Sequence, residues 1–142
     1  MEMKEIFANN KNIAVVGMTD NPKKPSNSVP MYMIRQGFNV TPVNPTIESA
    51  AGRKSYPSLL DVPDPIHIVN VFRRSEFIPE IVEQAIERHK NNGDVNVIWL
   101  QEGIVSPESR ALAEENGIIF IEDLCMFKEF DKLYTRSRTE IL

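Results

Sequence analysis

The stretch NIAVVGMTDNPKKPS, residues 12–26, decides how this chain is expected to fold. An apolar run of strand length leads directly into Gly17, as it does in front of a phosphate-binding loop. The dinucleotide fingerprint G-x-G-x-x-G nevertheless fails at once, because Met18, Thr19 and Asp20 follow Gly17 and are themselves followed by prolines and lysines. The stretch therefore predicts a strand and a nucleotide-type loop that differs from the loop of NAD-binding proteins.

Four further apolar runs have the length of strands, namely FNVTPVN (38–44), IHIVNVF (66–72), VNVIWL (95–100) and GIIFIE (117–122). Several are apolar on both faces, as strands covered by helices on both sides are. The segments between the runs show helical patterns over 28–37, 75–93 and 106–117, with Ser28, Ser75 and Ser106 as N-caps and Gly37, Gly93 and Gly117 as left-handed C-terminal residues. This alternation predicts an α/β, Rossmann-like fold: an open, mostly parallel five-stranded sheet with helices on both faces.

Three prolines test the boundaries of these helices. Pro107 falls at the first helical position after Ser106, where its missing N–H costs nothing. Pro30 is tolerable in the first turn if the helix begins at Ser28, whereas an earlier start would make it a helix breaker. Pro79 is expected to bend the second helix or to delay its start.

Length and composition predict a single domain, 1–142, with a core at about 8–128 and a tail, 129–142. The segment 126–134 is expected to form a short helix before a frayed polar end, and 45–65 is expected to be irregular. The net charge of −4 argues against a nucleic-acid partner, and no stretch approaches the roughly 20 apolar residues that span a membrane. A single cysteine and the lack of a signal-peptide core favour the cytoplasm.

The carboxyl ends of the predicted strands are the expected place for a ligand, because open parallel sheets bind ligands there. Gly17 would let a ligand approach the backbone closely. The loop after it brings Lys24 and Ser26 to the start of the first helix, where N–H groups, the helix dipole and a cation favour a phosphate. The alternative is a turn that closes the connection between strand and helix, with solvated lysines.

The end of the second strand argues against NAD as that ligand. A dinucleotide enzyme usually carries Asp or Glu at this point, ~20 residues past the glycines, to bind the ribose hydroxyls. Here the strand ends in TPVNPT, with Asn44 followed by Pro45, and no carboxylate is present. Two of the three fingerprint glycines are also missing, so a different phosphorylated ligand is expected.

Four motifs taken together resemble the small CoA-binding domain proteins: IAVVGMTDNPKKPSNSV (13–29), VTPVNP (40–45), YPSLLDVPDPIHIVNVFRRSE (56–76) and VIWLQEGI (97–104). These proteins are in turn similar to the N-terminal CoA-binding domain of the succinyl-CoA synthetase alpha subunit. The resemblance spans roughly residues 8–128, and the four motifs in this order are specific. Each motif alone would be weak evidence for the resemblance.

The resemblance implies coenzyme A as the ligand and assigns a part of it to each strand end. Gly17, Met18 and Thr19 would contact the phosphates or the pantetheine end, and Lys24, Pro25 and Ser26 would cradle a phosphate. Val43, Asn44 and Pro45 would flank the adenosine, Val71, Phe72 and Arg73 would form another wall, and Leu100, Gln101 and Gly103 would reach the extended arm.

Physical reasoning agrees in kind with this assignment. The pyrophosphate and 3′-phosphate of CoA favour a helix N-terminus with cations beside it. Phe72 offers an aromatic face to the adenine, and Arg73 can bind a phosphate through two hydrogen bonds. The alternative for Arg73 and Arg74 is a solvated basic turn in front of a helix.

The chain departs from the family pattern near its last strand, where an Arg-Cys-Pro motif is common. Here Leu124 and Met126 flank Cys125. The thiol of Cys125 would either form a mixed disulfide with the ligand's own thiol or be an inert buried group. The inert role is favoured, because no activating cation is evident in the sequence.

The resemblance therefore implies a protein that binds CoA or acyl-CoA without catalysis, as a binding, carrier or sensor protein. No triad spacing and no metal-ligand spacing is evident around the histidines. One alternative is a small NAD(P)- or acyl-CoA-dependent enzyme that uses Glu102 or Cys125. Another is an interaction module that has lost its ligand. A second copy of the chain and an unidentified protein both remain open as partners.

Overall fold

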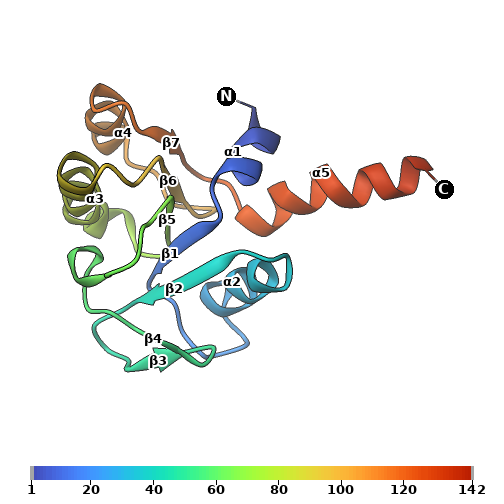
Figure 1. The fold of residues 1–142 in the computed structure, drawn as a ribbon, viewed down its shortest axis with the longest axis horizontal. Coiled ribbons are helices and arrows are strands. Elements are labelled where there is room, and N and C mark those ends of the chain that lie inside the picture. The colour runs from blue at the N-terminus through green and yellow to red at the C-terminus, as the bar shows by residue number, and fades with distance from the viewer. Residues whose placement is uncertain (1, 142) are drawn as a thin grey trace.

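Five parallel strands form the main sheet of the chain, in a computed structural model that describes residues 2–141 and, for 135–141, the backbone alone. The strands are β1 (Asn12–Val16), β2 (Asn39–Val43), β5 (Ile68–Val71), β6 (Val97–Leu100) and β7 (Ile119–Ile121). Their order is β2-β1-β5-β6-β7, and every neighbouring pair is parallel. The predicted α/β sheet is confirmed (Figure 1). The chain adds β2 on one side of β1 and the later strands on the other side, so the switch point of the topology lies between β1 and β5.

The helices cover both faces of this sheet, as predicted (Figure 1). One face packs against α3 (Ile78–Asn92) and α4 (Pro107–Glu115), and the other against α1 (Met3–Asn9), α2 (Pro25–Arg35) and α5 (Met126–Ile141). The positions of the side chains in β1 explain why its residues 13–16 are all apolar. Ala14 and Val16 face the first group of helices, whereas Ile13 and Val15 face the second.

Aromatic side chains from both ends of the chain build the core on the α1–α2–α5 face. The ring of Phe7 lies 5.2 Å from the ring of Phe130 and 5.6 Å from that of Trp99. Phe7 and Trp99 are fully buried, so the N-terminal helix, which the sequence analysis did not predict, belongs to the core. The predicted core bounds of 8–128 leave out both Phe7 and Phe130.

Helix α2 begins three residues before the predicted N-cap, Ser28, and that expectation was wrong. Pro25 occupies the first turn, and Pro30 therefore lies inside the helix. Because Pro30 has no N–H, the carbonyl of Ser26, four residues earlier, has no helical partner. The N–H of Thr19 donates to this carbonyl at 3.4 Å, so the proline is tolerated where the preceding loop folds back onto the helix.

The remaining boundaries differ in ways that the local sequence explains. Ser75 begins a 3₁₀ turn, η2 (Ser75–Phe77), and α3 starts only at Ile78 with Pro79 in its first turn, so the proline delays the helix. Another 3₁₀ turn, η1 (Leu59–Asp61), and a small hairpin of β3 (Ser49–Ala50) and β4 (Arg53–Lys54) interrupt the segment expected to be irregular. Ser106 and Pro107 start α4 as predicted. The last helix, expected over 126–134, continues to Ile141.

Candidate functional site

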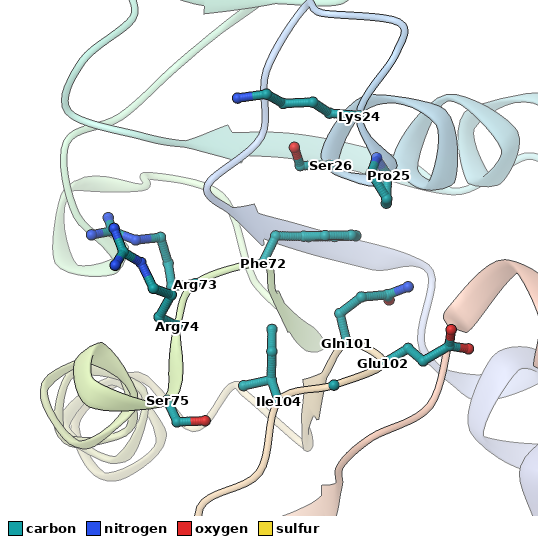
Figure 2. Close-up of a pocket in the computed structure, with 11 residues that line it drawn as sticks. Lys24, Pro25, Ser26, Phe72, Arg73, Arg74, Ser75, Gln101, Glu102 and Ile104 are labelled. Carbon is teal, nitrogen blue, oxygen red and sulfur yellow. The ribbon is translucent and has the colours of Figure 1, made fainter.

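A pocket of about 510 Å³ opens at the carboxyl ends of β1, β5 and β6, where the direction of the topology reverses. Three segments line it, which we call the α2 wall (Lys24–Ser26), the β5 wall (Phe72–Ser75) and the β6 turn (Gln101–Ile104). Figure 2 shows the Phe72 ring between Ser26 and Pro25 on one side and Gln101 on the other. Lys24 and Arg73 extend toward the same end of the pocket, and Glu102 points toward the opposite end.

The α2 wall is held in place by hydrogen bonds within its own loop. The amide of Asn27 donates to the carbonyl of Thr19 at 2.9 Å, and the N–H of Lys24 donates to the carbonyl of Asn21 at 3.1 Å. Lys24 occupies the N-cap position of α2 without a side-chain cap, so the positive end of the helix dipole faces the pocket. An anion placed here would meet both a cation and a helix N-terminus.

Gly17 is required by the packing of the protein itself. Its φ is +89°, and a Cβ atom at this position would lie 3.0 Å from the carbonyl oxygen of Phe72 and 3.3 Å from Cδ of Arg73. The expectation that Gly17 leaves room for a ligand thus needs a correction, because the space is taken by the β5 wall. The absence of a side chain at Gly17 lets Arg73 cross the end of β1.

Arg73 separates the main pocket from a second one. Its guanidinium lies 4.3 Å from the centre of the Phe77 ring, which holds the side chain across the end of the sheet. On the far side of Arg73 is a pocket of about 260 Å³, whose lining includes Val43 and Pro45 at the end of β2. The two pockets share Arg73 as a common wall.

The β6 turn carries a buried acceptor with an unmet hydrogen bond. Gln101 is 6% exposed, and among the described side chains its Oε1 is buried without a hydrogen-bond partner. The N–H of Ile104 donates to the carbonyl of Gln101 at 3.0 Å, and Gly103 has a φ of +87°, as the third residue of a tight turn requires. Since an unsatisfied buried acceptor is costly, Gln101 is the side chain in this pocket most in need of a donor.

The structure brings about half of the expected site residues to the main pocket, namely Lys24, Pro25, Ser26, Phe72, Arg73, Gln101 and Gly103. The side chains of Met18, Val71 and Leu100 are instead part of the hydrophobic core. Asn44 holds the loop after β1, since its amide donates to the carbonyl of Met18 at 3.0 Å, and the Oγ1 of Thr19 accepts from the N–H of Asn21. The pocket lining also includes residues not assigned above, which are Arg74, Ser75, Glu102 and Ile104.

The groups considered for catalysis have protein partners or are buried. The Nζ of Lys128 lies 3.0 Å from the carboxylate of Glu102, and this hydrogen bond raises the pKa of Lys128 above its usual 10.5. Cys125 is only 7% exposed. Neither histidine lines the pocket, since His67 accepts the N–H of Asn12 at the other end of the sheet. In the part of the chain that the structure describes, no group of three or more His, Cys, Asp or Glu residues could hold a metal ion.

The fold and the site together define an α/β nucleotide-binding class of protein, with the ligand pocket at the switch point of a parallel sheet. Residues 11–131 match the CoA binding domain family, and the chain belongs to that family. None of the described helices is long and apolar enough to cross a membrane.

Individual relatives agree with this classification. The chain is 43% identical over 125 residues to the uncharacterized protein YneT of Bacillus subtilis, covering 88% of this chain and 89% of YneT. A solved hypothetical protein from Pyrococcus horikoshii is 38% identical with a TM-score of 0.86, covering 92% of this chain and 88% of that one. A part of an ADP-forming acetate–CoA ligase from Archaeoglobus fulgidus is 28% identical over 80 residues, which are 55% of this chain and 12% of the ligase.

Proposed function

We propose that this chain binds coenzyme A, free or acylated, in the pocket between the α2 wall, the β5 wall and the β6 turn. The observation that carries the proposal is a pocket lined by Lys24, Arg73 and Gln101, in which the buried Oε1 of Gln101 has no partner among the described residues. CoA joins phosphates, which need cations, to a pantetheine arm with two amide N–H donors. The pocket offers partners for both kinds of group.

In this proposal the phosphates lie at the basic end of the pocket. Lys24 and the N-terminus of α2 bind one phosphate, and the guanidinium of Arg73 binds another. The adenosine occupies the second pocket beyond Arg73, near Val43 and Pro45. That arrangement retains the adenosine role expected for the end of β2.

The pantetheine arm then runs past Phe72 toward the β6 turn. The ring of Phe72 is partly buried and offers an apolar surface to the arm. When the side-chain amide of Gln101 turns toward the arm, an amide N–H of the arm donates to its Oε1 and satisfies an acceptor that is otherwise buried without a partner. The thiol end of the ligand leaves the pocket toward Glu102.

We further propose that the role of the chain is to bind CoA without transforming it, as a carrier or sensor. Glu102 is paired with Lys128, and Cys125 is buried, so neither side chain is presented as a base or nucleophile. The rival function is an acyl-CoA-using enzyme. It is favoured if incubation with acetyl-CoA releases free thiol faster than a buffer control.

A thermal-shift panel tests the proposed ligand. CoA and acetyl-CoA should raise the melting temperature with increasing concentration, because a ligand that binds only the folded state stabilises it by mass action. Dephospho-CoA should give a smaller shift, since it lacks the 3′-phosphate. A shift with NAD or NADP and none with CoA would refute the proposal.

A further inference from the structure

The β6 turn is held by a part of the chain that lies about twenty residues further on. The carboxylate of Asp123, between β7 and α5, accepts the N–H of Gly103 at 2.7 Å. The backbone N–H of Asp123 donates to the carbonyl of Ile104 at 3.2 Å. Asp123 thus binds two successive residues of the turn, Gly103 through its side chain and Ile104 through its backbone N–H.

The backbone conformation of Asp123 is unusual for a residue with a side chain. Its φ is +58°, in the left-handed region that L-residues rarely adopt, although Asp and Asn tolerate it better than most. In this conformation the same residue can offer both its N–H and its carboxylate to the β6 turn. The strained backbone therefore coincides with the two bonds that fix the turn.

Neighbouring residues hold the same two segments together. The indole N–H of Trp99, at the end of β6, donates to the carbonyl of Leu124 at 2.8 Å. This bond fixes the segment that carries Asp123 relative to the strand that carries Gln101. Trp99 is fully buried, so the pair of segments is anchored in the core. The bonds that reach the turn itself come from Asp123 and from the pairing of Lys128 with Glu102.

We propose that Asp123 is a positioning residue for ligand binding: it holds the β6 turn so that Gln101 presents its Oε1 to the pantetheine arm. The inference rests on the proposed CoA function and adds to it a residue that does not line the pocket. Its consequence is selective. Loss of the Asp123 side chain weakens the binding of ligands that carry the arm and spares ligands that consist of the nucleotide end alone.

The test compares calorimetric dissociation constants for CoA and for adenosine 3′,5′-bisphosphate, which lacks the arm. In Asp123→Ala and Asp123→Gly the affinity for CoA should fall about tenfold, the size of one charge-assisted hydrogen bond. The affinity for the bisphosphate should change less than about twofold, because its contacts lie at the basic end of the pocket. Asp123→Asn keeps an acceptor oxygen and tolerates the positive φ, so it should bind both ligands nearly as wild type does.

Two of these variants separate the hydrogen bond from the backbone strain. Glycine relieves the strain at φ +58° and removes the carboxylate, whereas alanine keeps the strain and removes the carboxylate. Equal loss of CoA affinity in both assigns the effect to the bond with Gly103. Wild-type affinity in Asp123→Gly would assign it to backbone geometry and overturn the proposal.

A matched control is Asp20→Ala, which removes a bond of the same kind. The carboxylate of Asp20 accepts the N–H of Ala51 at 2.8 Å, outside the β6 turn. This variant should leave the ratio of the two affinities unchanged. A ratio that shifts as much in Asp20→Ala as in Asp123→Ala would show a general loss of structure and contradict the positioning role.

A ligand-free readout distinguishes failure of this inference from failure of the proposed function. Hydrogen exchange of the Gly103 amide should be faster in Asp123→Ala than in wild type, because its acceptor is lost. Unchanged exchange overturns the positioning role even if CoA binds. Faster exchange, combined with wild-type protein that binds no CoA, leaves the hydrogen bond established and rejects the ligand assignment.

Discussion

The α2 wall and the β6 turn face each other across the pocket, but they are held in opposite ways. The loop that leads to the α2 wall is fixed mainly by bonds among its own residues, such as those that join Thr19 to Asn27 and to Ser26. The β6 turn depends on Asp123, about twenty residues along the chain, and on Lys128, which lies 26 residues from its partner Glu102. The comparison teaches that bonds between distant parts of the chain only supplement the local bonds at the α2 wall, where Asn44 and Ala51 supply them, whereas they reach the β6 turn itself.

The two sides of the pocket also present different chemical groups. The basic side presents Lys24, which is exposed, and Arg73, which is partly exposed and lies over the Phe77 ring. The β6 turn presents a buried acceptor that has no partner among the described residues. Removing the cation of Lys24 should therefore leave the stability of the ligand-free protein unchanged, whereas removing the Gln101 acceptor should maintain or raise it, and the following predictions use that difference.

The largest effect is expected at Gly17, which packs against the β5 wall at the end of β1. In Gly17→Ala the positive φ alone should lower the free energy of unfolding by about 1–2 kcal/mol. The new Cβ would also press on the carbonyl of Phe72 and displace Arg73, so CoA binding should be lost. Urea denaturation and calorimetry measure the two effects.

The matched control for this prediction is Gly37→Ala. Gly37 has a similar φ, +95°, but a Cβ there would meet nothing within 4 Å. This variant should lose stability through the backbone alone and should bind CoA as wild type does. Equal binding by Gly17→Ala would show that the crossing of Arg73 over β1 does not matter for the site.

Loss of the cation of Lys24 or of Arg73 should lower the affinity for CoA by about tenfold without lowering the stability of the protein. The variants are Lys24→Gln and Arg73→Gln, and the expected size is that of a hydrogen bond to a charged group. Lys23→Gln is the control, because Lys23 is adjacent in sequence but lines neither pocket. If Lys23→Gln weakens CoA as much as Lys24→Gln does, the binding reflects general charge and not the α2 wall. Calorimetric titration at two salt concentrations measures both.

Gln101→Met should move stability and affinity in opposite directions. The substitution keeps the approximate shape and removes a buried acceptor without a partner, so the ligand-free protein should be as stable as wild type or more stable. The affinity for CoA should fall about threefold to tenfold, since the arm loses its acceptor. A variant that is less stable and binds CoA normally would mean that Gln101 has a structural role.

The smallest effect concerns Glu122, which supports the segment just after the β6 turn. Its carboxylate accepts the N–H of Ser106 and pairs with Arg110, both at 2.9 Å. Burial raises the pKa of Glu122, but the Ser106 N–H and the Arg110 guanidinium outweigh it, so the pKa lies below its ordinary 4.5. The folded state thus favours the ionised form, and its stabilisation is present above pH 4.5 and is lost as the pH falls through the lowered pKa.

Glu122→Gln should accordingly cost up to about 1 kcal/mol at neutral pH, and the difference from wild type should shrink below pH 4 or so. Thermal unfolding across pH 3–7 measures it. Glu114→Gln, which removes the exposed partner of the same Arg110, should have little effect at any pH. A constant difference across this pH range would contradict the role of the Glu122 charge.

The sequence predicted the local features of this protein better than the tertiary ones. The alternation of apolar runs was sufficient for the sheet, and the ends of the predicted strands led to Lys24 and Arg73, which line the same pocket. The start of α2 was misplaced, because the acceptance of Pro30 depends on a hydrogen bond from Thr19 that no local pattern shows. The burial of Met18 in the core was also missed, because it depends on how the loop after β1 packs and not on a local pattern.

The contribution of Asp123 could not be predicted from residue spacing alone. An aspartate after a strand is usually a turn residue, and only the fold places this one against Gly103. The helix α1 also went unnoticed, since seven residues carry too short a pattern to be recognised. Its Phe7 becomes informative only when Trp99 and Phe130 are seen around it.

Calorimetric titration of the wild-type chain with CoA, dephospho-CoA and NAD tests the central claim most directly. The account predicts saturable one-to-one binding of CoA, weaker binding of dephospho-CoA, and no heat of binding for NAD. Saturable binding of NAD together with no binding of CoA would contradict it.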